Sequence, residues 1–341
     1  MKIVKHLAIW VAISLIVQLG ALFYLDKYYL VAQTKFKSKE VFEATPKKQD
    51  VKVKIPTDAT QINISYEGTY LSYMQNGSLI VVNTTNNDTK TFSPAAGNTI
   101  SMYKWLNDKD RVYVVERTES NFQLYYYDAV KDASALVKNI TYSTRYSSVT
   151  AIGSSAMTNM DFFKINRGET TSYIYYKDIM NNVGSVDTVT SRIGKMYTLL
   201  RKPEVIYEDT YNGKIYDTVY DSSSYYPINI SGSKVNALIG VDDSDNVYIG
   251  DVVNNLVDKI YYGNLKDTTD KWQSIALAAP TDPNNIFVTQ AGDICVNNPA
   301  KNQVLSLKSN NITAYKGTFI EMSDAGIISN DKGILVKTMY K

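Results

Sequence analysis

The sequence predicts an all-β protein, a β-propeller of seven blades with six as the alternative, preceded by an N-terminal transmembrane helix. Three observations support this prediction. The 341 residues include 28 tyrosines together with many Val, Ile and Thr residues, which favour strands. Short strand-like runs recur every 41 to 50 residues, which is the size of one propeller blade. An uncharged apolar run of 19 residues lies near the N-terminus.

The apolar run covers residues 7–25, LAIWVAISLIVQLGALFYL, and follows a short tail of residues 1–6. At the rise of an α-helix it spans ~28 Å, close to the hydrocarbon thickness of a bilayer. A cleaved signal peptide is the alternative. However, the run is longer than a usual signal core, and the nearest small-residue site, residues 30–32, begins with a large Leu. We therefore predict an uncleaved signal anchor.

Lysines flank this helix on both sides. Four follow it and two precede it, namely Lys27, Lys35, Lys37 and Lys39 against Lys2 and Lys5. A strict count of these charges leaves the body in the cytoplasm, but large domains cross membranes with little regard to charge. The surface rich in Ser, Thr, Asn and Tyr indicates export, and the bias toward Lys, Asn, Ile and Tyr indicates a bacterial protein. We therefore predict a single-pass protein of the cell membrane with its body outside the cytoplasm.

Residues 26–50 form the predicted juxtamembrane linker, because their charges are mixed and their apolar residues scattered. The lysines of this stretch are interpreted as part of a solvated stalk. Binding of an anionic lipid or wall polymer is the alternative.

Residues 51–341 form the predicted propeller domain. The most obvious strand of each repeat is centred on one of six residues, Val81, Tyr125, Tyr175, Tyr216, Tyr261 and Leu305. Successive centres lie 44, 50, 41, 45 and 44 residues apart, and another strand-like run precedes each of them. Helical solenoids have similar periods, but apolar stripes at helical spacing are missing here while β-branched and aromatic runs recur. The repeats are therefore predicted to be blades.

The seventh blade is predicted from the two ends of this domain. Residues 319–339 hold three strand-like runs and lack a fourth, and residues 51–55 form a single such run. Joined together, they complete a blade and close the ring, which removes exposed sheet edges.

Residues 240–265, GVDDSDNVYIGDVVNNLVDKIYYGNL, contain a hairpin with strands at residues 246–250 and 258–262. This stretch resembles a blade of the NHL-like repeat family, and the repeat spacing of residues 51–341 is similar to that of TolB-like and NHL-like propellers. Asp245 stands where that family usually has Gly, and Leu256 where it usually has Arg. The resemblance implies a blade and no particular activity. The matching positions are Val241, Asp243, Asn246, Val247, Tyr248, Ile249, Asp251, Asn254, Asn255, Lys259 and Ile260.

Composition excludes several classes of function. The net charge is +2, so no strong field attracts nucleic acid and no nucleic-acid partner is expected. The only histidine, His6, lies outside the predicted propeller, which excludes Ser-His-Asp, Cys-His and histidine–metal sites there. The single cysteine, Cys295, cannot form an intramolecular disulfide. It is interpreted as a buried apolar residue, with a reactive thiol as the alternative.

Two acidic groups are candidates for chemistry. The first comprises Asp242, Asp243, Asp245 and Asp251, which are interpreted as turn residues, with calcium binding as the alternative. The second comprises Glu204, Glu208 and Asp209. On a strand, the two glutamates share a face but lie ~13 Å apart, beyond the separation of paired glycosidase carboxylates. We therefore interpret this second group as solvated edge charges.

Aromatic residues are the remaining candidates. The tyrosine clusters are interpreted as packing between sheets, with stacking on sugar rings as the alternative; they comprise residues 125–127, 175–176, 225–226 and 261–262. Trp105 precedes a predicted turn and is interpreted as a core anchor.

These observations assign no catalytic, cofactor-binding or metal-binding residue, and no cofactor or metal is predicted. The predicted function is a non-catalytic binding or scaffolding module of the cell envelope, with a protein or glycan partner. The alternative is a glycan-active hydrolase or lyase that uses carboxylates and tyrosines in the propeller funnel. A disc that only closes an oligomeric membrane complex is a third possibility.

Overall fold

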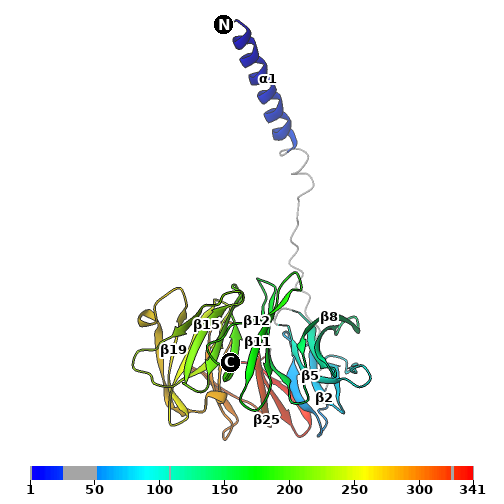
Figure 1. Ribbon diagram of the computed structural model, residues 1–341, viewed down its shortest axis with the longest axis vertical. Helices are drawn as coiled ribbons and strands as arrows, with labels where there is room; N and C mark the ends of the chain where they lie inside the picture. The colour runs from blue at the N-terminus through cyan, green and yellow to red at the C-terminus, as the bar shows by residue number, and fades with distance from the viewer. Residues whose placement is uncertain (1, 26–51, 107–108, 324–325, 341) are drawn as a thin grey trace. The chain divides into compact units, whose positions relative to one another are not determined.

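A computed structural model describes residues 2–25, 52–106, 109–323 and 326–340 (Figure 1). The chain separates into two units, residues 1–49 and 50–341. The first contains the predicted N-terminal helix, α1 (Lys2–Tyr24). Within the described ranges, no helix reaches the length and apolarity that a membrane span requires, so the membrane-spanning role of residues 7–25 stays a prediction. The predicted linker, residues 26–50, lies outside the described residues.

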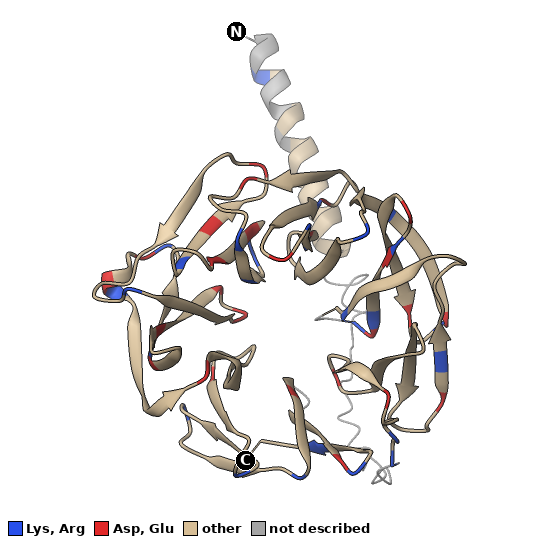
Figure 2. Cartoon of the chain, turned by 60° about the horizontal axis from the view of Figure 1, so that its bottom comes forward, with Lys and Arg blue, Asp and Glu red and all other residues tan. Residues whose placement is uncertain are grey.

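The second unit consists of seven antiparallel sheets, and Figure 2 shows them arranged as a ring. The first sheet comprises β1 (Thr60–Ile64), β2 (Tyr70–Gln75), β3 (Ser78–Asn83) and β4 (Thr89–Phe92). The second comprises β5 (Thr99–Trp105), β6 (Arg111–Arg117), β7 (Asn121–Asp128) and β8 (Ala133–Tyr142). The third comprises β9 (Ser148–Ser155), β10 (Met160–Asn166), β11 (Ser172–Lys177) and β12 (Val183–Val186). The fourth comprises β13 (Ile193–Thr198), β14 (Glu204–Asp209), β15 (Lys214–Val219) and β16 (Tyr225–Ile228).

The last three sheets follow the same order along the chain. The fifth comprises β17 (Asn236–Val241), β18 (Asn246–Val253), β19 (Leu256–Asn264) and β20 (Gln273–Thr281). The sixth comprises β21 (Ile286–Val288), β22 (Ile294–Asn298), β23 (Gln303–Ser306) and β24 (Ile312–Ala314). The seventh comprises β25 (Thr318–Ser323), β26 (Gly326–Asp331) and β27 (Ile334–Thr338). Two 3₁₀ helices flank β20, namely η2 (Thr269–Lys271) and η3 (Pro283–Asn285).

The structure confirms the seven-bladed propeller and excludes the six-bladed alternative. The six predicted repeat centres all fall on the third strand of a sheet, from Val81 in β3 to Leu305 in β23. The third strand gives a clear signal because, like the second, it pairs on both sides within its sheet and is therefore rich in β-formers.

The ring is closed by the N-terminal end of the propeller, as predicted. Lys54 bridges Ile334 in β27, the Ile55 amide donates to Gly333 O at 2.8 Å, and the Leu335 amide donates to Val53 O at 2.9 Å. The side chains of Val53 and Ile55 are only 2% and 4% exposed. Residues 53–55 therefore form the fourth strand of the last blade and cover its edge.

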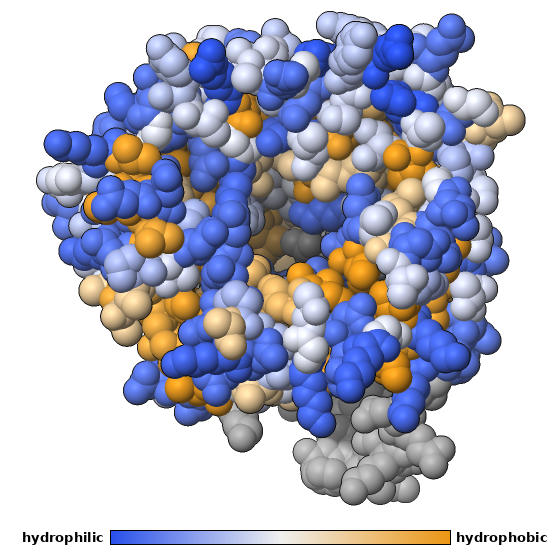
Figure 3. All heavy atoms as spheres, turned by 90° about the horizontal axis from the view of Figure 1, so that it is seen from below, coloured by the Kyte–Doolittle hydropathy of each residue, from blue (hydrophilic) through white to orange (hydrophobic). Residues whose placement is uncertain are grey.

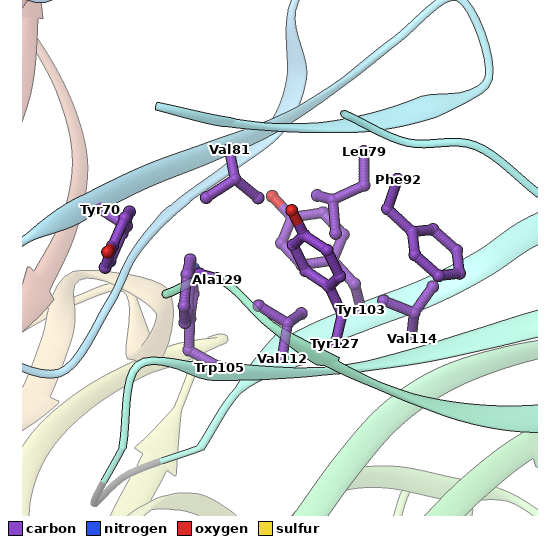
Figure 4. Close-up of a cluster of buried hydrophobic side chains, with 10 residues drawn as sticks. All are labelled: Tyr70, Leu79, Val81, Phe92, Tyr103, Trp105, Val112, Val114, Tyr127 and Ala129. Atoms are coloured by element: carbon purple, nitrogen blue, oxygen red, sulfur yellow. The ribbon is translucent and has the colours of Figure 1, made fainter. Parts of the chain in front are cut away.

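Apolar side chains fill the space between neighbouring blades. Figure 4 shows the cluster between the first two blades. Trp105 stacks on Tyr70, with ring centroids 5.9 Å apart, and its indole N–H donates to Ser72 Oγ at 2.8 Å. The predicted core role of Trp105 is therefore confirmed.

Two other predictions about single side chains have different outcomes. Cys295 is buried as predicted, and burial raises the pKa of its thiol to about 12. The prediction that Tyr225 and Tyr226 pack between sheets is wrong, because these side chains are 44% and 57% exposed. Both lie on β16, the outermost strand of its blade, where no further sheet covers them.

Candidate functional site

A cavity of about 390 Å³ lies at the centre of the ring, and the first strand of every blade contributes to its wall. Figure 3 shows the propeller hollowed at its centre. The lining residues come from the C-terminal ends of these strands and from the turns that follow, except for Tyr340, which follows β27. We call this cavity the funnel.

Lys104, near the end of β5, brings a positive charge into the funnel wall. Its ammonium donates to Ile152 O at 2.8 Å, and among the described residues it forms no ion pair. Burial lowers the pKa of Lys104, and the negative charge of Asp161 partly opposes this effect. A desolvated cation with donors to spare is poised to bind an anionic group.

Glu321, on β25, brings a carboxyl group into the same funnel. One of its oxygens accepts from the Ile64 amide of the first blade. Burial raises the pKa of Glu321 to about 7, against the opposing effect of that hydrogen bond. With its pKa raised this far, the carboxyl group can be protonated and donate a hydrogen bond, or be ionised and accept one.

The rest of the funnel wall is amphipathic. Tyr197 on β13 lines it, and burial raises the pKa of its hydroxyl to about 12, with the charge of Glu208 adding to the shift. Phe287 and Met322 supply apolar surface, and Gln290 supplies an amide. A few polar groups set in an apolar wall are typical of sites that orient one ligand.

The first acidic group of the sequence forms a turn beside the funnel. Asp242 Oδ1 accepts from the amides of Ser244 and Asn246, both at 2.9 Å, and its Oδ2 accepts from the Tyr248 hydroxyl at 2.9 Å. Asp245 has φ +61°, a left-handed conformation that Gly adopts readily and Asp tolerates. The interpretation as turn formers is confirmed for Asp242, Asp243 and Asp245, and it is wrong for Asp251, which lies within β18 and pairs with Lys259 of β19.

Glu208 and Glu204, from the second acidic group, have different surroundings in the structure. Glu208 bridges two strands, because its oxygens accept from the amides of Lys195 and Leu238, each at 2.7 Å. Glu204 instead lies 3.4 Å from the Lys202 ammonium. The interpretation of Glu208 as a solvated edge charge is therefore wrong, since this residue links the fourth blade to the fifth.

The neighbour of Glu204 is Asp217 on β15, which the sequence analysis did not single out. Asp217 is 9% exposed, and its Oδ1 has no hydrogen-bond partner. Burial raises its pKa to about 7, and the charge of Glu204 adds to this shift. The sequence does not distinguish Asp217, because one Asp among Ile, Tyr, Thr and Val is typical of a strand with alternating polar and apolar residues.

Asp217→Asn is expected to flatten the pH dependence of stability. The pKa of Asp217 lies above its ordinary 3.8 in the folded state, so the stability that its proton confers is fully present below pH 4 and is lost as the pH rises to 7. The variant keeps a neutral side chain at every pH. The free energy of unfolding of the variant, relative to that of the unmodified protein, should therefore increase by a few kcal/mol between pH 4 and pH 8. Urea denaturation at the two pH values measures both. An equal difference in free energy of unfolding at both pH values would contradict the raised pKa of Asp217.

A polar network missed by the sequence analysis lies beside the funnel. Asp161 accepts from the Ser154 hydroxyl at 2.8 Å and from the Tyr113 hydroxyl at 3.0 Å. It also pairs with Lys177 at 3.0 Å, and both charged side chains are less than a tenth exposed. These groups line a second cavity of about 200 Å³, which shares Leu106 and Ser154 with the funnel wall. The network joins the second blade to the third.

No family model matches the chain, and no curated protein matches it either. Similar solved structures include a virginiamycin B lyase from Staphylococcus aureus, which is 14% identical; the match covers 86% of this chain and 99% of that one, with a TM-score of 0.55. A streptogramin B lyase is 12% identical over 84% and 95% of the two chains, with a TM-score of 0.53. A chain of a mitotic checkpoint complex is 10% identical over 86% and 92%, with a TM-score of 0.56. The structural similarity establishes the propeller fold. At identities this low it shows the fold alone, and the NHL-like label stays a resemblance.

Proposed function

We propose that this protein is a membrane-anchored, extracytoplasmic β-propeller that binds a protein or glycan of the cell envelope in its funnel without chemically altering it. One observation carries the proposal. Two ionisable groups from different blades, Lys104 and Glu321, line one cavity, and each keeps hydrogen-bonding capacity that no described residue uses. Buried polar groups normally have partners, so a ligand that satisfies both groups would gain affinity.

The apolar run of residues 7–25 supports the anchor. The helix α1 has 23 residues, which corresponds to about 34 Å at the usual rise. Its described apolar side chains lie exposed along its length; Trp10, Ile16 and Phe23 are 71%, 69% and 62% exposed. Such a helix is stabilised by a lipid environment. The export-type surface composition supports placing the propeller outside the cytoplasm.

The absence of histidine from the propeller sequence supports binding rather than catalysis. A variant of the similar virginiamycin B lyase in which one histidine is replaced by alanine is catalytically inactive. The present chain has only His6, which precedes the propeller. In addition, the Asp242 carboxylate at the funnel is occupied by donors from its own turn.

A glycan-active hydrolase or lyase is the second candidate, and Glu321 favours it. A carboxyl group with a pKa near 7 suits a general acid or base, and Tyr197 lines the same funnel. If this candidate is correct, the purified chain releases reducing or unsaturated sugar ends from envelope glycans, and Glu321→Gln abolishes the release. Binding of these glycans without any product supports the binding module instead.

Photo-crosslinking in intact cells tests the funnel as the binding site. A benzophenone amino acid replacing Gln290 in the funnel wall is expected to give a defined adduct. The same amino acid at the exposed Lys266, which lies outside the funnel lining, is expected to give none. Lys104→Met removes the charge but keeps the side-chain length. It should therefore weaken the Gln290 adduct about tenfold, as expected for loss of one charged hydrogen bond.

Two results would count against the funnel. One is equal adducts at Gln290 and Lys266, and the other is an adduct at Gln290 that Lys104→Met leaves unchanged. Protease or glycan-degrading enzymes then show whether the adduct contains a protein or a glycan.

A further inference from the structure

Four of the six arginines in the sequence lie at one end of three successive blades. In an antiparallel sheet, the turn after the second strand and the connection after the fourth lie at the same end. Arg117 and Arg167 lie at or just after the ends of second strands, and Arg145 and Arg192 lie in connections between blades. The funnel lining follows the first strands, so these arginines are at the opposite end of the sheets.

Three of these arginines gather around one segment, residues 141–147. The Arg117 guanidinium donates to Arg145 O at 3.3 Å. Arg167 donates through Nη1 to Tyr142 O at 2.5 Å and through Nη2 to the hydroxyl of Thr141 at 3.2 Å. These contacts hold two guanidinium groups beside the segment that carries the third.

None of these three charges is neutralised by a described carboxylate. The ion pairs of the described residues involve Arg111, Lys177 and Lys202 instead. Glu119 and Glu169 occupy the same turns, but both are exposed and neither forms an ion pair with the arginines. Arg145 is exposed, and its side chain donates no hydrogen bond to any residue that the structure describes. A cluster of three guanidinium groups without a carboxylate partner among the described residues favours binding of carboxylate or phosphate groups.

Exposed tyrosine rings lie among the arginines. Arg167 lies over the Tyr142 ring at 3.9 Å, and Arg145 lies over the Tyr146 ring at 5.8 Å. These two rings are 59% and 76% exposed. No exposed large aliphatic side chain occurs among residues 118–120, 141–147 and 168–171, whereas protein interfaces usually have an apolar core. Flat aromatic faces suit sugar rings, which are amphipathic.

We propose that residues Arg117, Tyr142, Arg145, Tyr146 and Arg167, the Arg–Tyr surface, bind an anionic polysaccharide. The guanidinium groups bind its carboxylates or phosphates, and the tyrosine rings stack on its sugars. This site lies at the other end of the sheets from the funnel lining and does not depend on what the funnel binds.

Binding of defined polymers to the purified full chain in mild detergent tests the proposal. Polygalacturonate has sugar rings and carboxylates, dextran has rings alone, and polyphosphate and polyglutamate have charges alone. Polygalacturonate is expected to bind more tightly than the other three, and its affinity should fall as salt is added because the charges are screened. Arg145→Glu should weaken this binding at least tenfold, since it replaces an attractive charge by a repulsive one.

The Arg145 side chain forms no hydrogen bond with a described residue, and the bond from Arg117 goes to its backbone oxygen. Its replacement should therefore leave the fold intact, as circular dichroism and the denaturation midpoint can verify. Tyr146→Ala should weaken polygalacturonate binding but not polyphosphate binding. The matched control is Lys266→Glu, an equal charge reversal at the other end of a distant blade, which should have little effect. Equal weakening by Lys266→Glu overturns the site, equal or tighter binding of polyphosphate overturns sugar recognition, and tighter binding of polyglutamate indicates a protein partner instead.

Discussion

Replacing Val53 and Ile55 together by aspartate is expected to lower the free energy of unfolding by more than about 4 kcal/mol, because two carboxylates would enter an apolar interface without partners. Both side chains are almost fully buried, and their backbone forms the last strand of the ring. The measurement is the midpoint of urea denaturation of the full chain.

The control for this prediction is Lys54→Asp, which changes the net charge by the same amount. Lys54 lies between the two replaced residues, and its side chain is exposed. We therefore expect a change within about 0.5 kcal/mol, as for ordinary surface substitutions. Similar midpoints for both variants would show that this strand does not close the ring.

Asp161→Leu is expected to destabilise the propeller by about 3 to 5 kcal/mol, because it leaves the buried Lys177 ammonium without its counter-charge. The Tyr113 and Ser154 hydroxyls lose their acceptor at the same time. Lys177→Met alone should have an effect of similar size, since it leaves the carboxylate buried and unpaired. Urea denaturation of each variant gives these values.

The double variant Asp161→Leu with Lys177→Met distinguishes this account from a simple loss of packing. Two apolar side chains replace a buried ion pair, an exchange that is often close to neutral. We therefore expect the double variant to be more stable than either single variant. Additive losses would show that the two charges do not depend on each other.

The fold was largely predictable because a propeller repeats one local pattern. Third strands such as β19, with Ile260 and Tyr261, repeat at blade spacing. The closing strand was predictable by counting strands. Residues 319–339 hold three strand-like runs, residues 51–55 hold one, and a blade needs four. Tyr225 and Tyr226 were misassigned because the sequence does not reveal which strand of a blade is outermost.

The funnel was not predictable from the sequence. Lys104 and Glu321 are separated by 217 positions, and only closure of the ring brings their blades around one axis. First strands carry a weaker signal than third strands, and a single Lys or Glu in such a strand looks like a solvent-facing residue. Glu208 illustrates the same limit, because its two amide partners lie on different strands, and register sets both contacts.

The most direct test of the account is cysteine labelling in intact cells with a membrane-impermeant maleimide. Cys295 is the only cysteine and is buried, so a Cys295→Ser background carrying Asn86→Cys reports on an exposed site of the propeller. A second variant carrying Lys5→Cys reports on the part of α1 that precedes the apolar run. We predict that Asn86→Cys is labelled in intact cells and that Lys5→Cys is labelled only after lysis. Labelling of Asn86→Cys only after lysis would contradict a propeller anchored outside the cytoplasm.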